Sequence, residues 1–213
     1  MRKVLDELKH DFFKGLVEDV ILARDRNAAD DSQAAKRNLV RSTVSAIEGV
    51  LWHARLVVLS YLEDLSEPTD IERMALRETS YVVRENGIIV EQPRHVPTTS
   101  MVRLIIALYE RMLDIEPIDF SGSDWKNFQD YVALRNRVTH PKDAQDIRLS
   151  QTDVEVAQAA LFWILELSIR FPEKANAALR DQLEIYDAFL QDLKNHDSAA
   201  LKLYKETLEE GRL

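Results

Sequence analysis

Apolar residues recur three and four positions apart along most of the chain, which is the spacing that places them on one face of an α-helix. This spacing predicts helices over about 2–24, 34–65, 70–78, 99–114, 124–139, 151–170, 173–195 and 197–210. Residues 25–33 are polar and predict a break between the first two helices. Pro172 predicts the start of a further helix, because proline is favoured in a first helical turn. Ser123 is a candidate cap for the helix that begins at 124.

Residues 80–92 depart from helical spacing. Two β-branched runs flank the sequence Glu85-Asn86-Gly87, and Asn-Gly between such runs is a strong signal for a β-hairpin. Because an isolated hairpin is marginally stable in water, we expect this one to lie against the helices. The fold class predicted is therefore all-α, with one small β-hairpin insertion and a C-terminal helical extension.

The length of 213 residues allows one domain with an appended segment. We expect a helical domain over 1–172 and a C-terminal helical extension over 173–213 that packs on it. With 46% hydrophobic and 31% charged residues, the chain has the composition of a globular protein rather than a disordered one.

Composition also excludes several kinds of chemistry. The chain has no cysteine, so disulfides, zinc–thiolate sites and thiol catalysis are excluded. Its five histidines have no metal-site spacing, and no Gly-rich phosphate loop occurs, so we expect neither a metal nor a cofactor. No apolar run is long enough to span a bilayer and no secretory leader is recognisable, so we expect a cytoplasmic protein without a membrane partner. The net charge of −9 argues against nonspecific coating of nucleic acid, and nothing indicates DNA readout.

One stretch differs from this acidic background. Residues 131–142 contain three basic side chains and no acidic one, in a segment that includes Arg135, Asn136, Arg137, His140 and Lys142. An arginine can hold a phosphate oxygen, and a histidine can move a proton near neutral pH, so this combination suits phosphodiester chemistry. Pro141 disfavours helical geometry at the residue before it, which places His140 at the end of its helix.

Geometry leaves two interpretations of this stretch open. Arg135 and His140 lie roughly 140° apart on an ideal helix, so they converge only if the last turn opens. In one interpretation they share a catalytic groove. In the other, His140 caps its helix and Arg135 or Arg137 pairs with a carboxylate. Glu48 stands in an otherwise apolar helix, where an unpaired charge would be costly, so we expect it to orient one of these arginines or to pair with Arg41 or Arg55.

The segment Arg135-Asn136-x-x-x-His140 resembles the R-x(4–6)-H motif of HEPN domains, and the resemblance covers roughly residues 35–170. The order of elements is also similar, with an early long helix bearing Arg41 and Glu48 and a later helix that ends in the motif. The resemblance implies an α-helical bundle that dimerises through its motif helices. Lys142 stands where members paired with nucleotidyltransferase antitoxins often carry a tyrosine, so regulation by tyrosine modification is not expected.

Active HEPN proteins are metal-independent endoribonucleases, and many belong to toxin–antitoxin or antiviral defence systems. The resemblance therefore implies RNA as substrate, His140 as general acid or base, Arg135 as the group that stabilises the phosphorane, and Asn136 as a positioning residue. Glu48, Arg137 and Lys142 are expected to support the site. An antitoxin or regulatory protein is an expected partner. Two alternatives stay open, namely a catalytically inactive interaction module of the same fold and a nucleotide-binding protein without hydrolysis.

Overall fold

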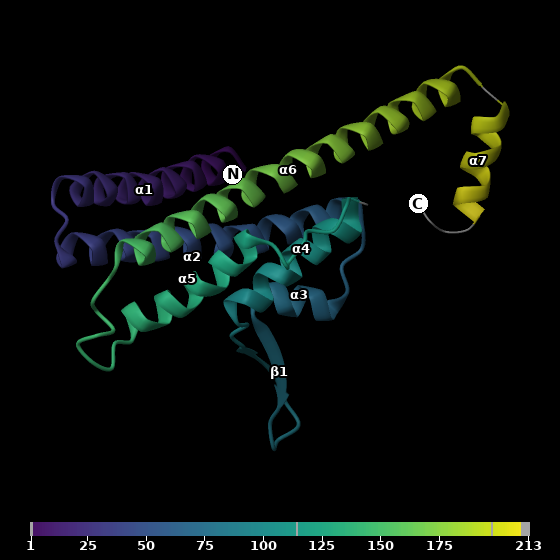
Figure 1. Cartoon of the computed structure of the whole chain (residues 1–213). Coiled ribbons are helices and arrows are strands. Elements are labelled where there is room, and N and C mark those ends of the chain that lie inside the picture. The colour runs from purple at the N-terminus through teal and green to yellow at the C-terminus, as the bar shows by residue number, and fades with distance from the viewer. Residues whose placement is uncertain (1, 114, 197, 210–213) are drawn as a thin grey trace. The chain divides into compact units, whose positions relative to one another are not determined.

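The computed structural model describes residues 2–113, 115–196 and 198–209, with side chains from Asp11 to Glu206. These described residues form seven helices and one two-stranded antiparallel sheet, so the predicted all-α fold with a small β insertion is confirmed. The elements, shown in Figure 1, are α1 (Arg2–Ala29), α2 (Gln33–Leu65), α3 (Asp70–Arg77), β1 (Thr79–Val83), β2 (Ile89–Pro93), α4 (Thr98–Leu113), α5 (Ser123–Thr139), α6 (Gln151–Lys194) and α7 (Ser198–Glu209).

The chain divides into two compact units on either side of the Phe171–Pro172 bond. The first unit contains α1 to α5, the hairpin and the first half of α6. The second contains the rest of α6 and α7. The prediction that Pro172 starts a new helix is wrong, because α6 continues through this proline. The residues that follow are mostly Ala, Leu, Glu, Lys and Arg, whose helix propensity offsets the cost of one interior proline.

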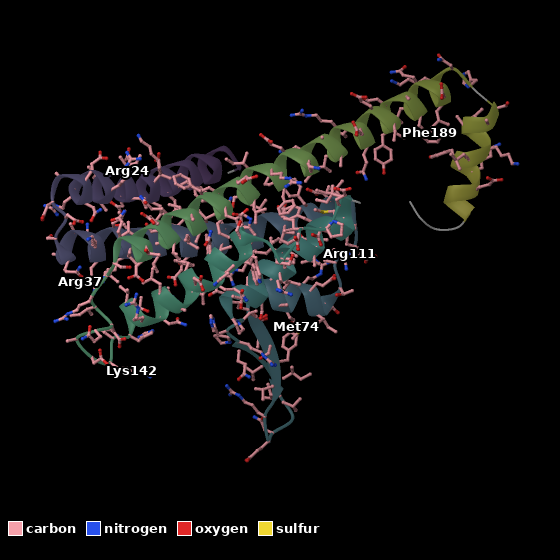
Figure 2. The ribbon with its side chains drawn as sticks, viewed as in Figure 1. Arg24, Arg37, Met74, Arg111, Lys142 and Phe189 are labelled. Atoms are coloured by element: carbon pink, nitrogen blue, oxygen red, sulfur yellow. The ribbon has the colours of Figure 1, made fainter. Side chains whose placement is uncertain are left out.

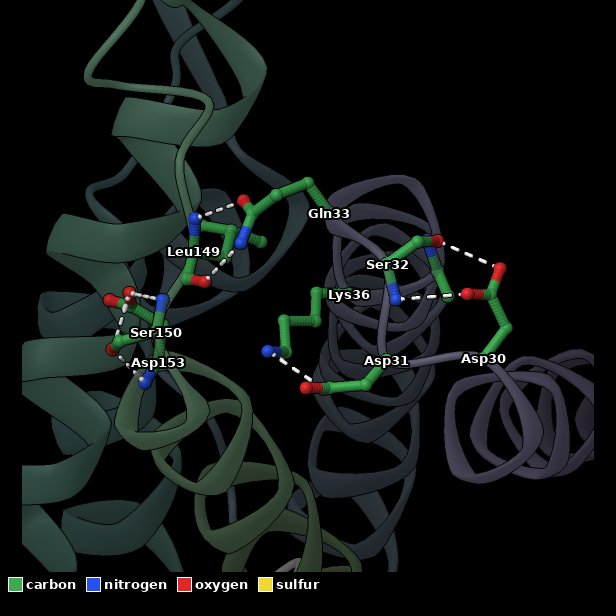
Figure 3. A network of polar contacts seen from close by, with 9 residues as sticks. Asp30, Asp31, Ser32, Gln33, Lys36, Leu149, Ser150 and Asp153 are labelled. Atoms are coloured by element: carbon green, nitrogen blue, oxygen red, sulfur yellow. Dashed lines mark hydrogen bonds and ion pairs between the residues drawn. The ribbon is translucent and has the colours of Figure 1, made fainter.

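The predicted break over 25–33 is shorter than expected, because α1 continues to Ala29. Asp30 accepts hydrogen bonds from the backbone N–H and the hydroxyl of Ser32, at 3.1 and 2.8 Å (Figure 3). The Ser32 hydroxyl in turn accepts from the N–H of Ala35 at 3.2 Å and so caps the start of α2. Asp25 and Arg26 are exposed residues of this helix and Asn27 is half-buried in it, so none of the three belongs to a loop.

The helix α2 is the central element of the first unit. Its buried side chains include Leu39, Val40, Ile47, Val58 and Leu62, all at most 1% exposed. The helix α1 runs alongside it (Figure 1). A Cβ at Gly49 of α2 would lie 2.5 Å from a methyl carbon of Leu16, so the glycine allows this close approach.

An aromatic cluster joins α4, α5 and α6 within the first unit. The ring of Trp163 lies 6.0 Å from that of Trp125 and 5.5 Å from that of Phe128, between ring centroids. Tyr109 stacks on Phe171 at 4.7 Å. Trp125 is 4% exposed and Phe128 is fully buried, so both rings belong to the core.

The start of α5 differs in detail from the prediction. Its N-cap is Gly122, and no side chain caps the first turn, so Ser123 is already helical and is not the cap. Asp124 in the first turn still places a negative charge near the positive end of the helix dipole.

The hairpin forms where the sequence predicts it. Its loop is Glu85-Asn86-Gly87, closed by a hydrogen bond from the Gly87 N–H to the Arg84 carbonyl at 2.8 Å. Gly87 has φ +77°, whereas Asn86 does not have a positive φ, so this is a three-residue loop ending in a left-handed glycine. The expectation that the hairpin lies against the helices is wrong for most of its length: Val83 and Ile89 are each 67% exposed, and Figure 1 shows the strands projecting from the helices. Contacts at its base, where Ser80 is buried, hold it in place.

Candidate functional site

The motif occupies the last turn of α5. The helix ends at Thr139, and His140 leaves helical geometry with φ −130° and ψ 58°. The N–H of His140 donates to the carbonyl of Asn136 at 3.1 Å, which closes the last turn. This is the helix end that Pro141 predicts, since the residue before a proline avoids helical geometry. The histidine therefore lies at the C-terminal end of α5, as expected.

Arg135 contacts the central helix through Glu48. Its Nε donates to Glu48 Oε1 at 2.8 Å, its Nη2 donates to the same oxygen, and its Nη1 donates to Asn136 Oδ1 at 3.1 Å. The contact expected between Glu48 and one of the two motif arginines is therefore present, and the arginine is Arg135. Arg55, which the sequence left as another partner for Glu48, instead donates to Glu78.

The guanidinium of Arg135 keeps donors that no described residue uses. An arginine has five N–H donors, and the contacts to Glu48 and Asn136 engage three of them. The side chain of Arg135 is 31% exposed, so the other two donors can reach a ligand from solvent. A carboxylate on one side and an amide on the other hold this fork in one orientation. The arrangement can bind an anion such as a phosphate oxygen.

His140 itself is exposed, and its imidazole makes no hydrogen bond or ion pair with any residue that the structure describes. Thr139, beside it, donates its hydroxyl to the carbonyl of Arg135 at 2.6 Å and so does not engage the ring. Both nitrogens of the imidazole are thus available to a substrate. This availability is what proton transfer at the motif requires.

Arg137 points to a different part of the fold. Its Nη1 donates to the carbonyl of Arg148 at 3.2 Å, and its Nη2 donates to Asp153. Asp153 also belongs to the start of α6, where its N–H donates to the hydroxyl of Ser150 at 3.1 Å and its carboxylate accepts from the Ser150 N–H at 2.7 Å. Arg137 therefore ties the end of α5 to the start of α6 and is not brought together with Arg135.

Lys142 lies on the loop after α5 (Figure 2), where its backbone N–H donates to Asp146 at 2.7 Å. The side chain of Lys142 is exposed, and none of the described contacts joins it to Arg135, Asn136 or His140. The far end of the loop is held by Gln33 of α2, which exchanges two hydrogen bonds of 2.8 Å with the backbone of Leu149 (Figure 3). The loop that follows the motif is thus fixed to the start of α2.

Tyr131 lies one turn before Arg135 on α5. It is 1% exposed, and burial raises the pKa of its hydroxyl well above the usual range. The nearby carboxylate of Glu48 acts in the same direction, whereas Arg135 opposes it. Tyr131 therefore stays a neutral phenol. Nothing in the sequence connects Tyr131 with Glu48.

The site adjoins an exposed aromatic residue on α2. Trp52 is 53% exposed and lies one turn after Glu48 in the same helix, at the i+4 position. Leu56, a further turn along, is 41% exposed. The helical spacing of Arg41, Ser45, Glu48 and Trp52 is visible in the sequence, but their shared exposure is not.

Comparisons of the chain with protein-family models, curated proteins and solved structures find no match. Over the described ranges, no three His, Asp or Glu side chains come together in a way that could hold a metal ion. None of the helices in those ranges is both long enough and apolar enough to cross a membrane.

Proposed function

We propose that this chain is a HEPN-like, metal-independent endoribonuclease that acts as a homodimer. One observation carries the proposal: Glu48 and Asn136 hold Arg135 at the same helix end where His140 is exposed, and no described residue occupies two of the Arg135 donors or the imidazole of His140. The resemblance of this segment to the R-x(4–6)-H motif supports the same conclusion. A role in a toxin–antitoxin or antiviral defence system, with an antitoxin or regulatory partner, is part of the proposal.

In the proposed reaction, the 2′-oxygen of the ribose attacks the adjacent phosphorus and the bond from phosphorus to the 5′-oxygen breaks. One proton leaves the 2′-hydroxyl and one reaches the departing 5′-oxygen. His140 takes or gives one of these protons, and Arg135 stabilises the charge that builds up on the phosphorane oxygens. Asn136 positions Arg135 through its amide oxygen.

The proposed dimer is supported by the number of protons that the reaction moves. The reaction needs one group that accepts a proton and another that donates one, and each chain carries one histidine in its motif. A second copy of the motif in the same cleft would supply the second histidine. Dimerisation through the motif helices is therefore proposed together with the activity.

The rival function is a non-catalytic interaction module of the same fold. It is favoured by the same ion pair, because Arg135 and Glu48 join α5 to α2 and could serve only that purpose. The two functions differ in what removal of the motif changes: a nuclease loses cleavage, whereas an interaction module loses stability or partner binding.

The test is cleavage of a mixed RNA pool in excess EDTA by the wild type and by His140→Asn. His196→Asn is the matched control, since His196 is also exposed and lies in the second unit. We expect cleavage by the wild type and by His196→Asn, and none by His140→Asn. Equal cleavage by all three proteins, or cleavage that stops in EDTA, would contradict the proposal. An inactive wild type that forms a stable dimer would favour the interaction module.

A further inference from the structure

The helix α2 leaves one continuous stripe of side chains exposed. Every exposed residue between Ala35 and Leu62 lies on this stripe, and the members recur three or four positions apart. They are Asn38, Arg41, Ser45, Glu48, Trp52, Leu56 and Ser60. All other positions in that range are buried or half-buried, so this stripe is the one side of α2 that a ligand can reach within the described part of the first unit.

Trp52 is the exposed indole on this stripe. The other two tryptophans, Trp125 and Trp163, are 4% and 8% exposed and belong to the core. The ring of Phe12 from α1 meets that of Trp52 edge-on, with centroids 6.5 Å apart, and is itself 44% exposed. Two rings held against each other and open to water form an aromatic platform, which we define as Phe12 and Trp52.

The charge on the stripe favours an anionic ligand. Its single acidic member is Glu48, and that carboxylate is already paired with Arg135, which keeps two donors unused. Arg41 is exposed and forms no ion pair with a described residue. Arg41 on the stripe and Arg135 beside Glu48 thus supply positive charge, and Trp52 of the aromatic platform lies one turn after Glu48 on α2.

We propose that this stripe binds single-stranded RNA, with a phosphate at Arg135 and an adjacent base stacked on Trp52. The inference rests on the proposed ribonuclease function and names the part of its substrate that is recognised. Bases of a duplex are stacked on one another, whereas those of a single strand can turn outward onto an aromatic ring. Stacking on an indole does not depend on base identity, so little sequence preference is expected from this contact.

The experiment measures binding of a labelled 2′-O-methyl oligouridylate, which has no free 2′-hydroxyl and is not cleaved. Anisotropy reports affinity, and tryptophan fluorescence reports contact with Trp52. We expect saturable quenching in the wild type and a loss of affinity of about 5- to 150-fold in Trp52→Leu, the range for one base stacked on an aromatic ring. Trp52→Phe should recover most of the affinity, because phenylalanine also stacks bases.

Ile71→Ala is the matched control, because it removes an exposed apolar side chain from α3, outside the stripe. RNA affinity should not change in this variant. Equal loss in Trp52→Leu and Ile71→Ala, or unchanged affinity in Trp52→Leu, overturns the proposal. A lower molecular mass of Trp52→Leu in solution, without a change in RNA affinity, also overturns it and identifies the stripe as an interface between copies of the chain.

The outcome is separable from that of the cleavage test. The 2′-O-methyl oligonucleotide is bound but not cleaved, so its affinity is measured whether or not the protein is an active ribonuclease. RNA binding that depends on Trp52, in a protein that cleaves nothing, would support this inference and contradict the proposed ribonuclease. Cleavage that needs His140, with RNA binding unaffected by Trp52→Leu, would contradict this inference alone.

Discussion

Arg135 and Arg137 provide a comparison within one helical turn. Both belong to α5, and the side chain of each is 31% exposed. Positions two residues apart are separated by about 200° around a helix, so the side chains of Arg135 and Arg137 leave α5 on nearly opposite sides. Replacing each by alanine should therefore have opposite consequences: Arg135→Ala should remove activity with little loss of stability, and Arg137→Ala should do the reverse.

The expected magnitudes come from the partners. Glu48, which accepts from Arg135, is 46% exposed, and ion pairs of such exposure contribute at most about 1 kcal/mol. Arg137 donates to a backbone carbonyl and to Asp153, whose side chain is 23% exposed. Hydrogen bonds of charged groups contribute about 1.5–3 kcal/mol, so about 2 kcal/mol is expected after allowing for partial exposure. In a chain of this size, Tm should fall by less than about 4 °C in Arg135→Ala and by about 4–8 °C in Arg137→Ala.

Stability is measured by urea unfolding followed by circular dichroism, and activity by cleavage of labelled RNA. Arg135→Ala should lower the cleavage rate by about 100-fold or more, as removal of one transition-state donor does elsewhere. Arg137→Ala should retain a rate close to that of the wild type at a temperature where it is folded. If Arg135→Ala lost as much stability as Arg137→Ala and cleaved RNA normally, Arg135 would be structural and the reasoning would be refuted.

Three further predictions concern single features. A hydrogen bond from Arg111, with a smaller contribution from the Thr69 backbone, lowers the pKa of Glu72 from 4.5 to about 2. The resulting stabilisation is present above pH 4.5 and is lost as the pH falls towards 2. In urea unfolding measured between about pH 2 and 5, the midpoint of Arg111→Ala should therefore depend less on pH than that of the wild type. Gly87→Ala should lower the free energy of unfolding by about 1 kcal/mol, because Gly87 has a positive φ. Gly15→Ala should raise it by up to about 1 kcal/mol, because Gly15 lies inside α1 and a Cβ there would meet no atom within 4 Å. Thermal unfolding measures both changes. Glu48→Ala should lower the rate of RNA cleavage and change the free energy of unfolding by less than about 1 kcal/mol. An unchanged cleavage rate would show that Glu48 is not part of the site.

Hydrophobic periodicity predicted the helices because burial of one face is what stabilises them. The predicted range 34–65 and the observed Gln33–Leu65 differ by one residue. The errors came from judging segments by composition. Asp25, Arg26 and Asn27 are polar yet helical, because they continue a helix that is largely exposed to water. Pro172 is a helix breaker by type, but one lost hydrogen bond does not interrupt α6 between two strongly helical segments.

The hairpin shows a different limit. Its position follows from Asn-Gly and β-branched residues, which act locally. Whether its apolar side chains are covered depends on where the helices pass, and local sequence does not determine that. Tyr81 is 57% exposed, although aromatic residues in strands are typical of a half-buried surface. A prediction from sequence could therefore give the turn but not its surroundings.

Within the candidate site, the sequence indicated that Glu48 needs a cationic partner but not which arginine supplies it. The choice depends on the rotation of α5 against α2, and the loop after the motif restricts that rotation. Gln33 exchanges hydrogen bonds with the backbone of Leu149, and Arg37 donates to the carbonyl of Ile147 at 3.1 Å. With the loop held there and Arg137 bound to Asp153, Arg135 is the arginine that faces Glu48.

The central helix α2 thus contributes to each part of the proposed site. Its start holds the loop that follows His140, its middle holds Arg135 through Glu48, and the next turn presents Trp52. Because the other sides of α2 are buried or half-buried between Ala35 and Leu62, these three groups are fixed in spacing by one packed helix. A fixed spacing between a phosphate-binding fork and a stacking ring is what a site needs if it is to hold one nucleotide in a defined position next to a histidine. The buried face of α2 and its exposed stripe therefore serve one purpose, since the packing that stabilises the fold also sets the geometry of the site.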